Sequence, residues 1–516
     1  MSRRIRWLGV VMVVCFAVVL VQLVNVQFRK AQALRTSASN PRNAVKKFDN
    51  PRGDILAANG QVLAQSILAP KGSGPYKYMR SYPTGQLFSQ IVGIDDSYYG
   101  AYTGIEQEYD SYLTAHSQSA KTLSQLLSPP PPTTDVVTLT LEPYLQQVAQ
   151  QALAGITSAN RDGAIVVLDV HTGAVLAMYS SPSYDPAPLA DPNVATEEKA
   201  GHADFDTTDA EGFSGGLPMA TYNRIFPGST FKIVTTAAVY NLAPQLANFN
   251  YPVSLCTKTL PDSNKIICND ADTPQLATPC GGPISVMLPE SCDPGYATLG
   301  MTIGATDMVK ESDLFGFNSV PPIDLPSAVS PSFFPSVTDF QPQNLGLAGL
   351  AYSSFGQQNV QATALQNAMV AAAVADGGTI MTPHVMASIH DASGHLVKTY
   401  QPTPWKQPMS ASSAQTINQL MQGVVAHGTA TGVQNAAGVS LASLHAAVKT
   451  GTGQTGLPNP NANIDDWMIG FAPANNPQVA VAVVVPYQPS NTYGATVAGP
   501  IMATMLQAAL NPPPGQ

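Results

Sequence analysis

The sequence predicts an α+β protein whose main antiparallel sheet is assembled from two distant parts of the chain. The strand patterns are short apolar runs bounded by turn residues, and they occur at 164–168, 175–178, 446–452, 466–471 and 479–485. The turn His171-Thr172-Gly173 joins the first two runs and predicts a hairpin. Alanine-rich helical patterns lie between the two groups, at 231–242 and 363–375, and a closing helix is predicted at 501–510. A five-stranded sheet with an inserted helical block is a layered α+β architecture.

The composition excludes several classes of protein. Of 516 residues, 44% are hydrophobic and 11% are charged, whereas about 25% are charged in an ordinary soluble protein. Disorder over the bulk of the chain would require low hydrophobicity and high charge, which is the opposite composition. The net charge of -9, with only 24 Lys and Arg, argues against a nucleic-acid partner, because binding phosphates requires a basic surface. A mean hydropathy of +0.03 is too low for a polytopic membrane protein.

The N-terminus predicts one membrane anchor. Residues 1–6 include three arginines, and 7–24 are apolar apart from Gln22, which approaches the length of a membrane-spanning helix. A cleaved signal peptide is the alternative, with Ala31-Gln32-Ala33 as its cleavage site, but its apolar region normally has only about 7–15 residues. We expect a cytoplasmic tail at 1–6 and an anchor at 7–26. The protein is then a single-pass protein of the cell membrane, with its main domain outside the cytoplasm.

The segment after the anchor predicts a modest, extended domain at 27–155. Asn59-Gly60 lies between apolar stretches and predicts a hairpin. Pro129 to Pro132 form a stiff break, followed by a strand pattern at 135–140 and an amphipathic helical pattern at 145–156. The main domain is predicted at 156–511, and a short tail at 512–516.

Cysteine usage agrees with export. Cys15 lies within the apolar N-terminal stretch, and four more cysteines crowd into one segment: Cys256, Cys268, Cys280 and Cys292. Disulfides form in oxidising compartments, and four cysteines allow three pairings, which the sequence leaves open. A zinc site is the rival interpretation, but none of the usual C-x-x-C or histidine spacings is present. The eight histidines form no metal-binding motif either, so no metal or cofactor is expected.

Ser229 and Lys232 form the first of three strings that carry chemistry. One helical turn separates the two residues, so hydroxyl and amine share a face at the start of an apolar helix. A serine needs a base to take its proton, and a lysine is a base only when neutral, which burial and a second cation promote. The ordinary alternative is a capping serine beside a surface lysine, and this string alone is weak evidence.

The other two strings are Lys449-Thr450-Gly451-Thr452 and Ser291-Cys292-Asp293. The first lies within a predicted strand, where glycine allows a substrate backbone to approach. Lys449 supplies the second cation, and backbone N–H groups there can stabilise an oxyanion. Ser291 adds a hydroxyl and Asp293 a carboxyl group. Taken singly, a Lys-Thr-Gly is more often a turn, and the serine string carries almost no information.

Together, and in their order along the chain (Ser229, Ser291, Lys449), the strings resemble the active site of the penicillin-binding proteins. In that family S-x-x-K opens a helix, S-x-N follows and K-T-G lies on a strand. The likeness is to class B, the monofunctional peptidoglycan D,D-transpeptidases, and it covers nearly the whole chain. Further matching strings are Arg52-Gly53-Asp54-Ile55, Ser181 to Pro186, Tyr222-Asn223-Arg224, Phe355-Gly356-Gln357, Thr363 to Gln366 and Trp467 to Pro473. The resemblance implies a transpeptidase domain of the penicillin-binding and serine β-lactamase-like fold, preceded by a non-catalytic pedestal.

The resemblance also implies roles for these residues. Ser229 attacks the penultimate D-Ala of a stem peptide, with Lys232 as general base. Ser291 and Lys449 relay a proton to the departing D-Ala. Backbone amides of Ser229 and Thr452 form the oxyanion hole, while Lys449 with Thr450 or Thr452 binds the donor carboxylate. An amine from a neighbouring stem then completes the cross-link, and β-lactams mimic the donor.

Asp293 departs from the family, which usually has Asn at this position, although some elongation-type members are similar in carrying Asp. An anion within about 4–6 Å raises a lysine pKa by about 1–3 units. Ionised Asp293 therefore hinders Lys232 as a base, unless it pairs mainly with Lys449 or stays protonated.

Three alternatives to a class B transpeptidase share some of these features. A class A enzyme needs a glycosyltransferase domain, for which the strand-rich segment before 160 has no room. A serine β-lactamase needs an activated water, and Glu311-Ser312-Asp313-Leu314 only faintly resembles its acidic loop. The third alternative is a catalytically silent scaffold of a wall-synthesis complex.

The resemblance extends to partners. It implies contact with a membrane-embedded glycan polymerase of the shape, elongation, division and sporulation (SEDS) family. The chain is also similar to the short actinobacterial members that lack C-terminal repeats associated with penicillin-binding proteins and Ser/Thr kinases (PASTA repeats). Whether it serves growth, division or sporulation stays open.

Overall fold

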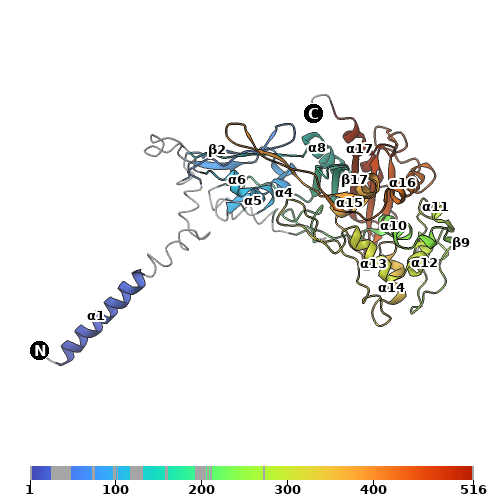
Figure 1. The fold of residues 1–516 in the computed structure, drawn as a ribbon, viewed down its shortest axis with the longest axis horizontal. Helices are drawn as coiled ribbons and strands as arrows, with labels where there is room; N and C mark the ends of the chain where they lie inside the picture. The colour runs from blue at the N-terminus through green and yellow to red at the C-terminus, as the bar shows by residue number, and fades with distance from the viewer. Residues whose placement is uncertain are drawn as a thin grey trace.

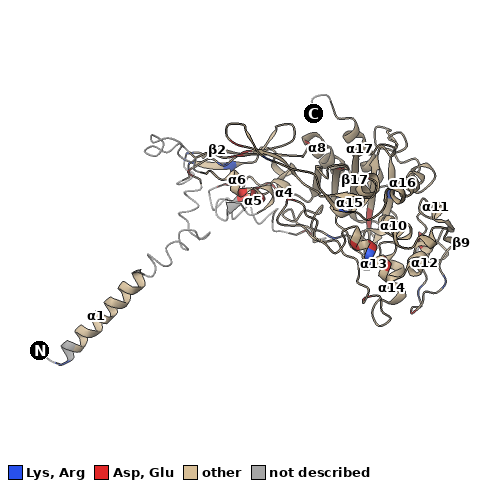
Figure 2. Cartoon of the chain, viewed as in Figure 1, with Lys and Arg blue, Asp and Glu red and all other residues tan. Residues whose placement is uncertain are grey.

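A computed structural model gives the arrangement of the chain. It describes residues 3–24, 48–71, 76–96, 100–101, 103–116, 132–156, 161–191, 205, 208–209, 212–270 and 274–513. Helix α1 (Arg3–Val24) stands apart at one end, and the body that contains helices α10 to α17 lies at the other, with strand β2 (Val62–Leu68) and its neighbours between them (Figure 1). Figure 2 shows how sparsely charged residues are distributed over the ribbon.

The central sheet is the predicted five-stranded antiparallel one. Its strand order is β15-β16-β17-β7-β8, and its strands are β7 (Gly163–Asp169), β8 (Val175–Ser181), β15 (Ala447–Gln454), β16 (Ile464–Ala472) and β17 (Val479–Gln488). The apolar runs are continuous because helices cover both faces. Along β17, Ala482 and Val484 face the core that includes α15 (Ala364–Ala375), whereas Val481 and Val483 face the core of α8 (Pro143–Ala154) and α17 (Ala498–Leu510). The strand β15 lies at one edge of this sheet.

The inserted helical block builds the region in front of that edge. Its longer helices are α10 (Lys232–Leu242), α12 (Asp293–Ile303), α13 (Ala305–Leu314), α14 (Gly346–Ser353) and α16 (Ala411–Ala426). Its short elements are η3 (Gly228–Phe231), η4 (Pro244–Leu246), β9 (Asn250–Ser254), β10 (Cys280–Pro283), α11 (Ile284–Met287), β11 (Ile380–Met381) and β14 (Pro404–Lys406). The prediction of helices at 231–242 and 363–375 is confirmed by α10 and α15.

A second sheet has six strands in the order β13-β12-β6-β1-β2-β3. Four strands come from the N-terminal half: β1 (Ile55–Leu56), β2, β3 (Tyr78–Ser81) and β6 (Val136–Leu139). The other two, β12 (Met386–His390) and β13 (Leu396–Thr399), come from far along the chain, and Figure 1 shows this orange segment beside the blue one. The sheet therefore joins strands from both sides of the predicted boundary at 155/156, which stays a prediction.

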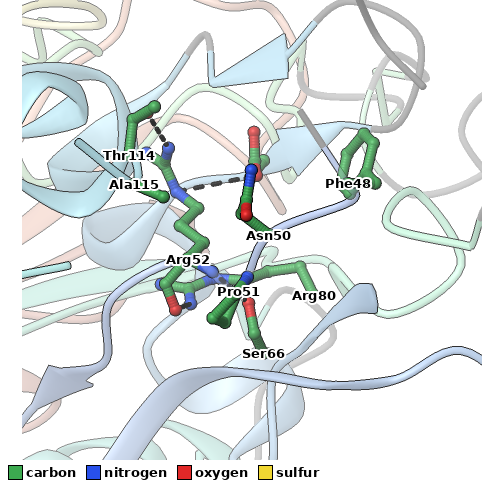
Figure 3. A pocket seen from close by; sticks show the side chains of 9 residues that line it. Phe48, Asn50, Pro51, Arg52, Ser66, Arg80, Thr114 and Ala115 are labelled. Carbon is green, nitrogen blue, oxygen red and sulfur yellow. Dashed lines mark hydrogen bonds and ion pairs between the residues drawn. The ribbon is translucent and has the colours of Figure 1, made fainter. Parts of the chain in front are cut away.

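The predicted Asn59-Gly60 hairpin is confirmed, since β1 and β2 pair antiparallel across it and Gly60 has φ +84°. The remaining short elements near it are η2 (Gly85–Leu87), α4 (Ser89–Val92), β4 (Asp95–Asp96), β5 (Gly100–Ala101), α5 (Gly104–Glu108) and α6 (Asp110–Leu113). A buried ion cluster ties these elements to the hairpin. Arg52 donates to Glu106 and Asp110, each at 2.6 Å, and Arg80 donates to the second oxygen of Glu106 at 2.6 Å. Figure 3 shows Arg52 and Arg80 with their neighbours Ser66 and Thr114.

The predicted anchor coincides largely with α1, whose apolar side chains from Trp7 to Leu23 are exposed. Within the described residues, no helix combines the length and the hydropathy that crossing a membrane requires.

Parts of several predictions lie outside the described residues. These parts are residues 1–2 of the predicted tail, the end of the predicted anchor and the start of the next domain at 25–47, the proline break at 129–131, and residues 514–516.

Candidate active site

The three strings meet at one cavity of about 580 Å³ beside the edge strand β15. Its wall includes Ser229, Ser291, Asp293 and the residues Thr450 to Thr452. The elements that bring them together are the turn η3, the start of α12 and the edge strand, which are far apart in the sequence. The site predicted from the sequence is therefore assembled as one constellation.

Ser229 lies in the 3₁₀ turn η3, and α10 begins only at Lys232. The string thus opens a helix as predicted, with a tighter first turn. Gly228 has φ +52°, and a Cβ there would collide with the carbonyl of Thr452. This glycine lets the turn lie directly against β15, which brings the Ser229 hydroxyl to the edge of the sheet.

Lys232 is fully buried and makes three hydrogen bonds. Its ammonium donates to the Ser291 carbonyl at 2.6 Å, to Ser291 Oγ at 3.1 Å and to Asp293 Oδ1 at 2.6 Å. It also lies 5.3 Å from the ring centre of Tyr296. Burial lowers the pKa of Lys232, although the charge of Asp293 opposes that shift.

Lys449 is also fully buried, and Ser291 connects it to Lys232. Lys449 Nζ donates to Ser291 Oγ at 2.9 Å and to the Thr450 carbonyl at 3.0 Å. Burial, and after it the positive charge of Lys232, lower the pKa of Lys449 well below its ordinary value. One hydroxyl therefore bridges two amines whose charged forms are both disfavoured. Ser291 itself has φ +59°, so its backbone is held in an uncommon conformation at this bridge.

The contacts of Asp293 show which of the two lysines it pairs with. Its Oδ1 accepts from Lys232 at 2.6 Å and from Ser229 Oγ at 3.5 Å, and the hydrogen bonds of the described residues include none between Asp293 and Lys449. The carboxyl group therefore pairs with Lys232 rather than with Lys449. No hydrogen bond between Ser229 Oγ and Lys232 Nζ is present among the described contacts, and Asp293 Oδ1 accepts from both groups.

The edge strand is held in place by contacts of Gln357, Thr429 and Gly451, and of these only Thr429 was not named from the sequence. Gln357 receives a hydrogen bond from the Gln454 amide at 3.0 Å and donates one to the Thr452 carbonyl at 3.0 Å. Thr429 and Thr450 share a hydroxyl–hydroxyl hydrogen bond of 2.6 Å. Gly451 has no room for a Cβ because Pro227 and Thr230 pack against it. Gln357 occurs in the matching string Phe355-Gly356-Gln357, whereas Thr429 stands in no recognised motif.

Two disulfides join the cysteines that were predicted to pair. They are Cys256–Cys268 and Cys280–Cys292, and Cys15 is free. We call residues 250–270 and 274–283 the disulfide hairpin, because β9 and β10 pair antiparallel at its base. Cys292 lies between Ser291 and Asp293, so the second disulfide ties the hairpin directly to the active site. Asn269 adds another link, since its side-chain oxygen accepts from the Asp293 amide at 3.0 Å.

Comparison with known proteins decides the family. The model of the penicillin-binding protein transpeptidase domain matches residues 163–507, and that of the penicillin-binding protein A dimerisation domain matches residues 52–134. The chain belongs to the penicillin-binding proteins. The resemblance and the fold predicted from the sequence are thereby confirmed.

Two relatives extend this result. The peptidoglycan D,D-transpeptidase PbpA of Mycolicibacterium smegmatis is 31% identical, over 99% of this chain and 99% of its own. A ceftriaxone acyl-enzyme structure of penicillin-binding protein A from Mycobacterium tuberculosis has a TM-score of 0.76 at 27% identity, covering 90% of this chain and 100% of that one. An imipenem acyl-enzyme structure of the same protein has a TM-score of 0.75 at 28% identity, with the same coverage.

In the described part of this penicillin-binding protein, no group of three or more His, Cys, Asp or Glu side chains is arranged to hold a metal ion.

Proposed function

We propose that this protein is a serine-type peptidoglycan D,D-transpeptidase that cross-links stem peptides through an acyl-Ser229 intermediate. One observation carries the proposal: the Ser291 hydroxyl bridges the buried amines of Lys232 and Lys449 at 3.1 and 2.9 Å, beside the cavity that contains Ser229. Such a chain can move a proton between nucleophile, base and leaving group without solvent. The names of the relatives, as D,D-transpeptidases, support the same reaction.

Acylation begins when Ser229 Oγ attacks the carbonyl carbon of the penultimate D-Ala. Lys232 takes the hydroxyl proton, and the direction of its pKa shift favours the neutral amine that a base requires. Because Asp293 Oδ1 accepts from both Ser229 and Lys232, the hydroxyl must turn from this oxygen toward the amine. The bond to the terminal D-Ala nitrogen then breaks, and the proton reaches that nitrogen through Ser291 and Lys449.

The edge of β15 supplies the electrostatic part of the site. Backbone amides of Ser229 and Thr452 form the oxyanion hole, where fixed N–H dipoles stabilise the developing charge. Lys449 with Thr450 or Thr452 binds the donor carboxylate, and Gly451 lets the substrate backbone approach the strand. In the second half-reaction, an acceptor amine attacks the ester and Ser229 recovers its proton. A β-lactam enters as a donor mimic and leaves a slowly hydrolysed acyl-Ser229.

The proposed location is the outer side of the cell membrane, with the chain anchored at 7–26. The exposed apolar side chains of α1 and the two disulfides near the active site support this location. We place a non-catalytic pedestal at 27–155 and the transpeptidase domain at 156–511. The pedestal and the anchor are the proposed contact with a SEDS-family glycan polymerase, in cell-wall synthesis during growth or division.

Labelling with a fluorescent penicillin tests the proposed enzyme against a silent scaffold. We expect the native chain to be labelled covalently, Ser229→Ala to lose the label, and Ser412→Ala, on the exposed face of α16, to keep it. An unlabelled native chain would favour the scaffold.

A further inference from the structure

The second half-reaction brings a cation into the cavity, and nothing assigned so far receives it. The acceptor is an amine, which is an ammonium ion at neutral pH. Lys449 and the threonines of β15 are assigned to the donor carboxylate. The ammonium needs an oxygen acceptor in the same cavity, preferably an anionic one.

The disulfide hairpin presents such a group. Asp270 lines the cavity together with Ile266, Leu276 and Thr278 of the same hairpin. Its Oδ2 accepts from Asn269 Nδ2 at 3.1 Å and from Thr278 Oγ1 at 3.0 Å, which fixes the carboxylate on the wall. Asn269 also binds the Asp293 amide, so the position of Asp270 is coupled to the catalytic string.

The charges around the cavity single out Asp270. Among the described residues that line it, two carry carboxyl groups, Asp270 and Asp293, and none is Lys or Arg. Asp293 is paired with Lys232 at 2.6 Å, whereas the ion pairs of the described residues include none for Asp270. Burial, and after it the charge of Asp293, raise the pKa of Asp270, whereas the more distant charges of Lys232 and Lys449 lower it. A cation bound in the cavity would place an opposite charge directly against this carboxylate.

We propose that Asp270 binds the ammonium group of the acceptor and positions it for attack on acyl-Ser229. The inference rests on the proposed transpeptidase function and assigns its acceptor subsite to the disulfide hairpin. The ammonium loses two protons on the way to the new amide. One returns to Ser229 Oγ as the ester bond breaks, and the other passes to water.

The test separates the two half-reactions in the full-length protein. The donor is a D-alanyl thioester, and release of its thiol reports the acylation step. The acceptor is D-alaninamide, a cation without a carboxylate. We expect Asp270→Asn to raise the acceptor concentration needed for half-maximal transfer by about tenfold, as loss of one partly screened ion pair would. In the absence of acceptor, the rate of thiol release by Asp270→Asn should differ from the native rate by less than twofold, which corresponds to about 0.4 kcal/mol.

Asp262→Asn is the matched control, because Asp262 is an exposed aspartate of the same hairpin, also at positive φ, and does not line the cavity. Asp270→Glu should recover part of the acceptor dependence. An unchanged acceptor dependence in Asp270→Asn would overturn the inference, and so would an equal loss of both half-reactions. Failure of the proposed function is distinguishable, since the native protein would then release no thiol and take no penicillin label.

Discussion

At the scale of single residues, Asp293 has the sharpest consequence, because it pairs with Lys232 and not with Lys449. The charge of Asp293 raises the pKa of Lys232 against the larger effect of burial. A base must be neutral, so its activity is lost as the pH falls below its pKa. Replacing Asp293 with Asn lowers this pKa further, and we expect the acidic limb of penicillin acylation to move to lower pH by about one unit or more.

The measurement is the second-order rate of penicillin acylation across pH, with Asp262→Asn as the control. A profile that does not move would show that Asp293 is electrostatically remote from the base. A shift to higher pH would show that its role is to orient Lys232.

Gly228 allows a second test at this scale. A Cβ there meets the Thr452 carbonyl, and φ is +52°, so Gly228→Ala combines backbone strain with displacement of β15. Gly394 has φ +81° with open space around it, and Gly394→Ala therefore carries the strain alone. We expect Gly228→Ala to slow penicillin acylation by about a hundredfold, since misplacement by about 1 Å costs that much, and Gly394→Ala to leave the rate unchanged. Equal rates in the two variants would show that contact with Thr452 does not position the nucleophile.

At the scale of elements, local patterns predicted much of the catalytic fold and part of the site. The strands at both ends and the helices between them follow from apolar periodicity, which each segment carries by itself. Lys232 and Lys449 were predicted because their strings have a fixed spacing and order. Asp270 and Thr429 were not predicted, because a single polar residue in a loop has no periodicity. Its role depends on which distant element of the fold lies opposite it.

The disulfide hairpin is an element whose pairing the sequence left open and whose role depends on it. Cys292 lies inside the catalytic string, and its bond to Cys280 fixes where Ser291 and Asp293 stand. We expect the double variant Cys280→Ser/Cys292→Ser to slow penicillin acylation at least about tenfold through misplaced groups. Cys15→Ser, which removes the free cysteine of α1, should have no effect.

The measurement is the rate constant of penicillin labelling for each purified variant. If the double variant reacts at the native rate, the hairpin does not hold the catalytic string. The thermal unfolding curve of the double variant shows independently whether the protein is still folded.

At the scale of the whole molecule, the two sheets are not independent. Strand β12 pairs with β6, so a segment from within the catalytic half of the chain completes the N-terminal sheet. Helix α8 buries Leu145, Ala149 and Leu153 in the core beneath the central sheet. Local patterns predicted both β6 and α8, but pairing between residues about 250 positions apart is a tertiary property that no window of sequence contains.

This coupling predicts where the chain can be shortened. A chain that begins at residue 156 loses both β6 and α8, which leaves β12 paired with β13 alone and exposes the apolar face beneath β8. A chain that begins at residue 135 keeps both elements and loses strands β1 to β3 with the short elements between residues 85 and 113. We expect the longer piece to unfold at a temperature at least about 5 °C higher, which for a domain of this size corresponds to more than about 1 kcal/mol. It should also retain penicillin labelling, whereas the shorter piece should expose β12 as an edge prone to association. Equal unfolding temperatures and equal labelling would show instead that folding of the catalytic half is complete from residue 156, and that the shared sheet forms only after each half has folded.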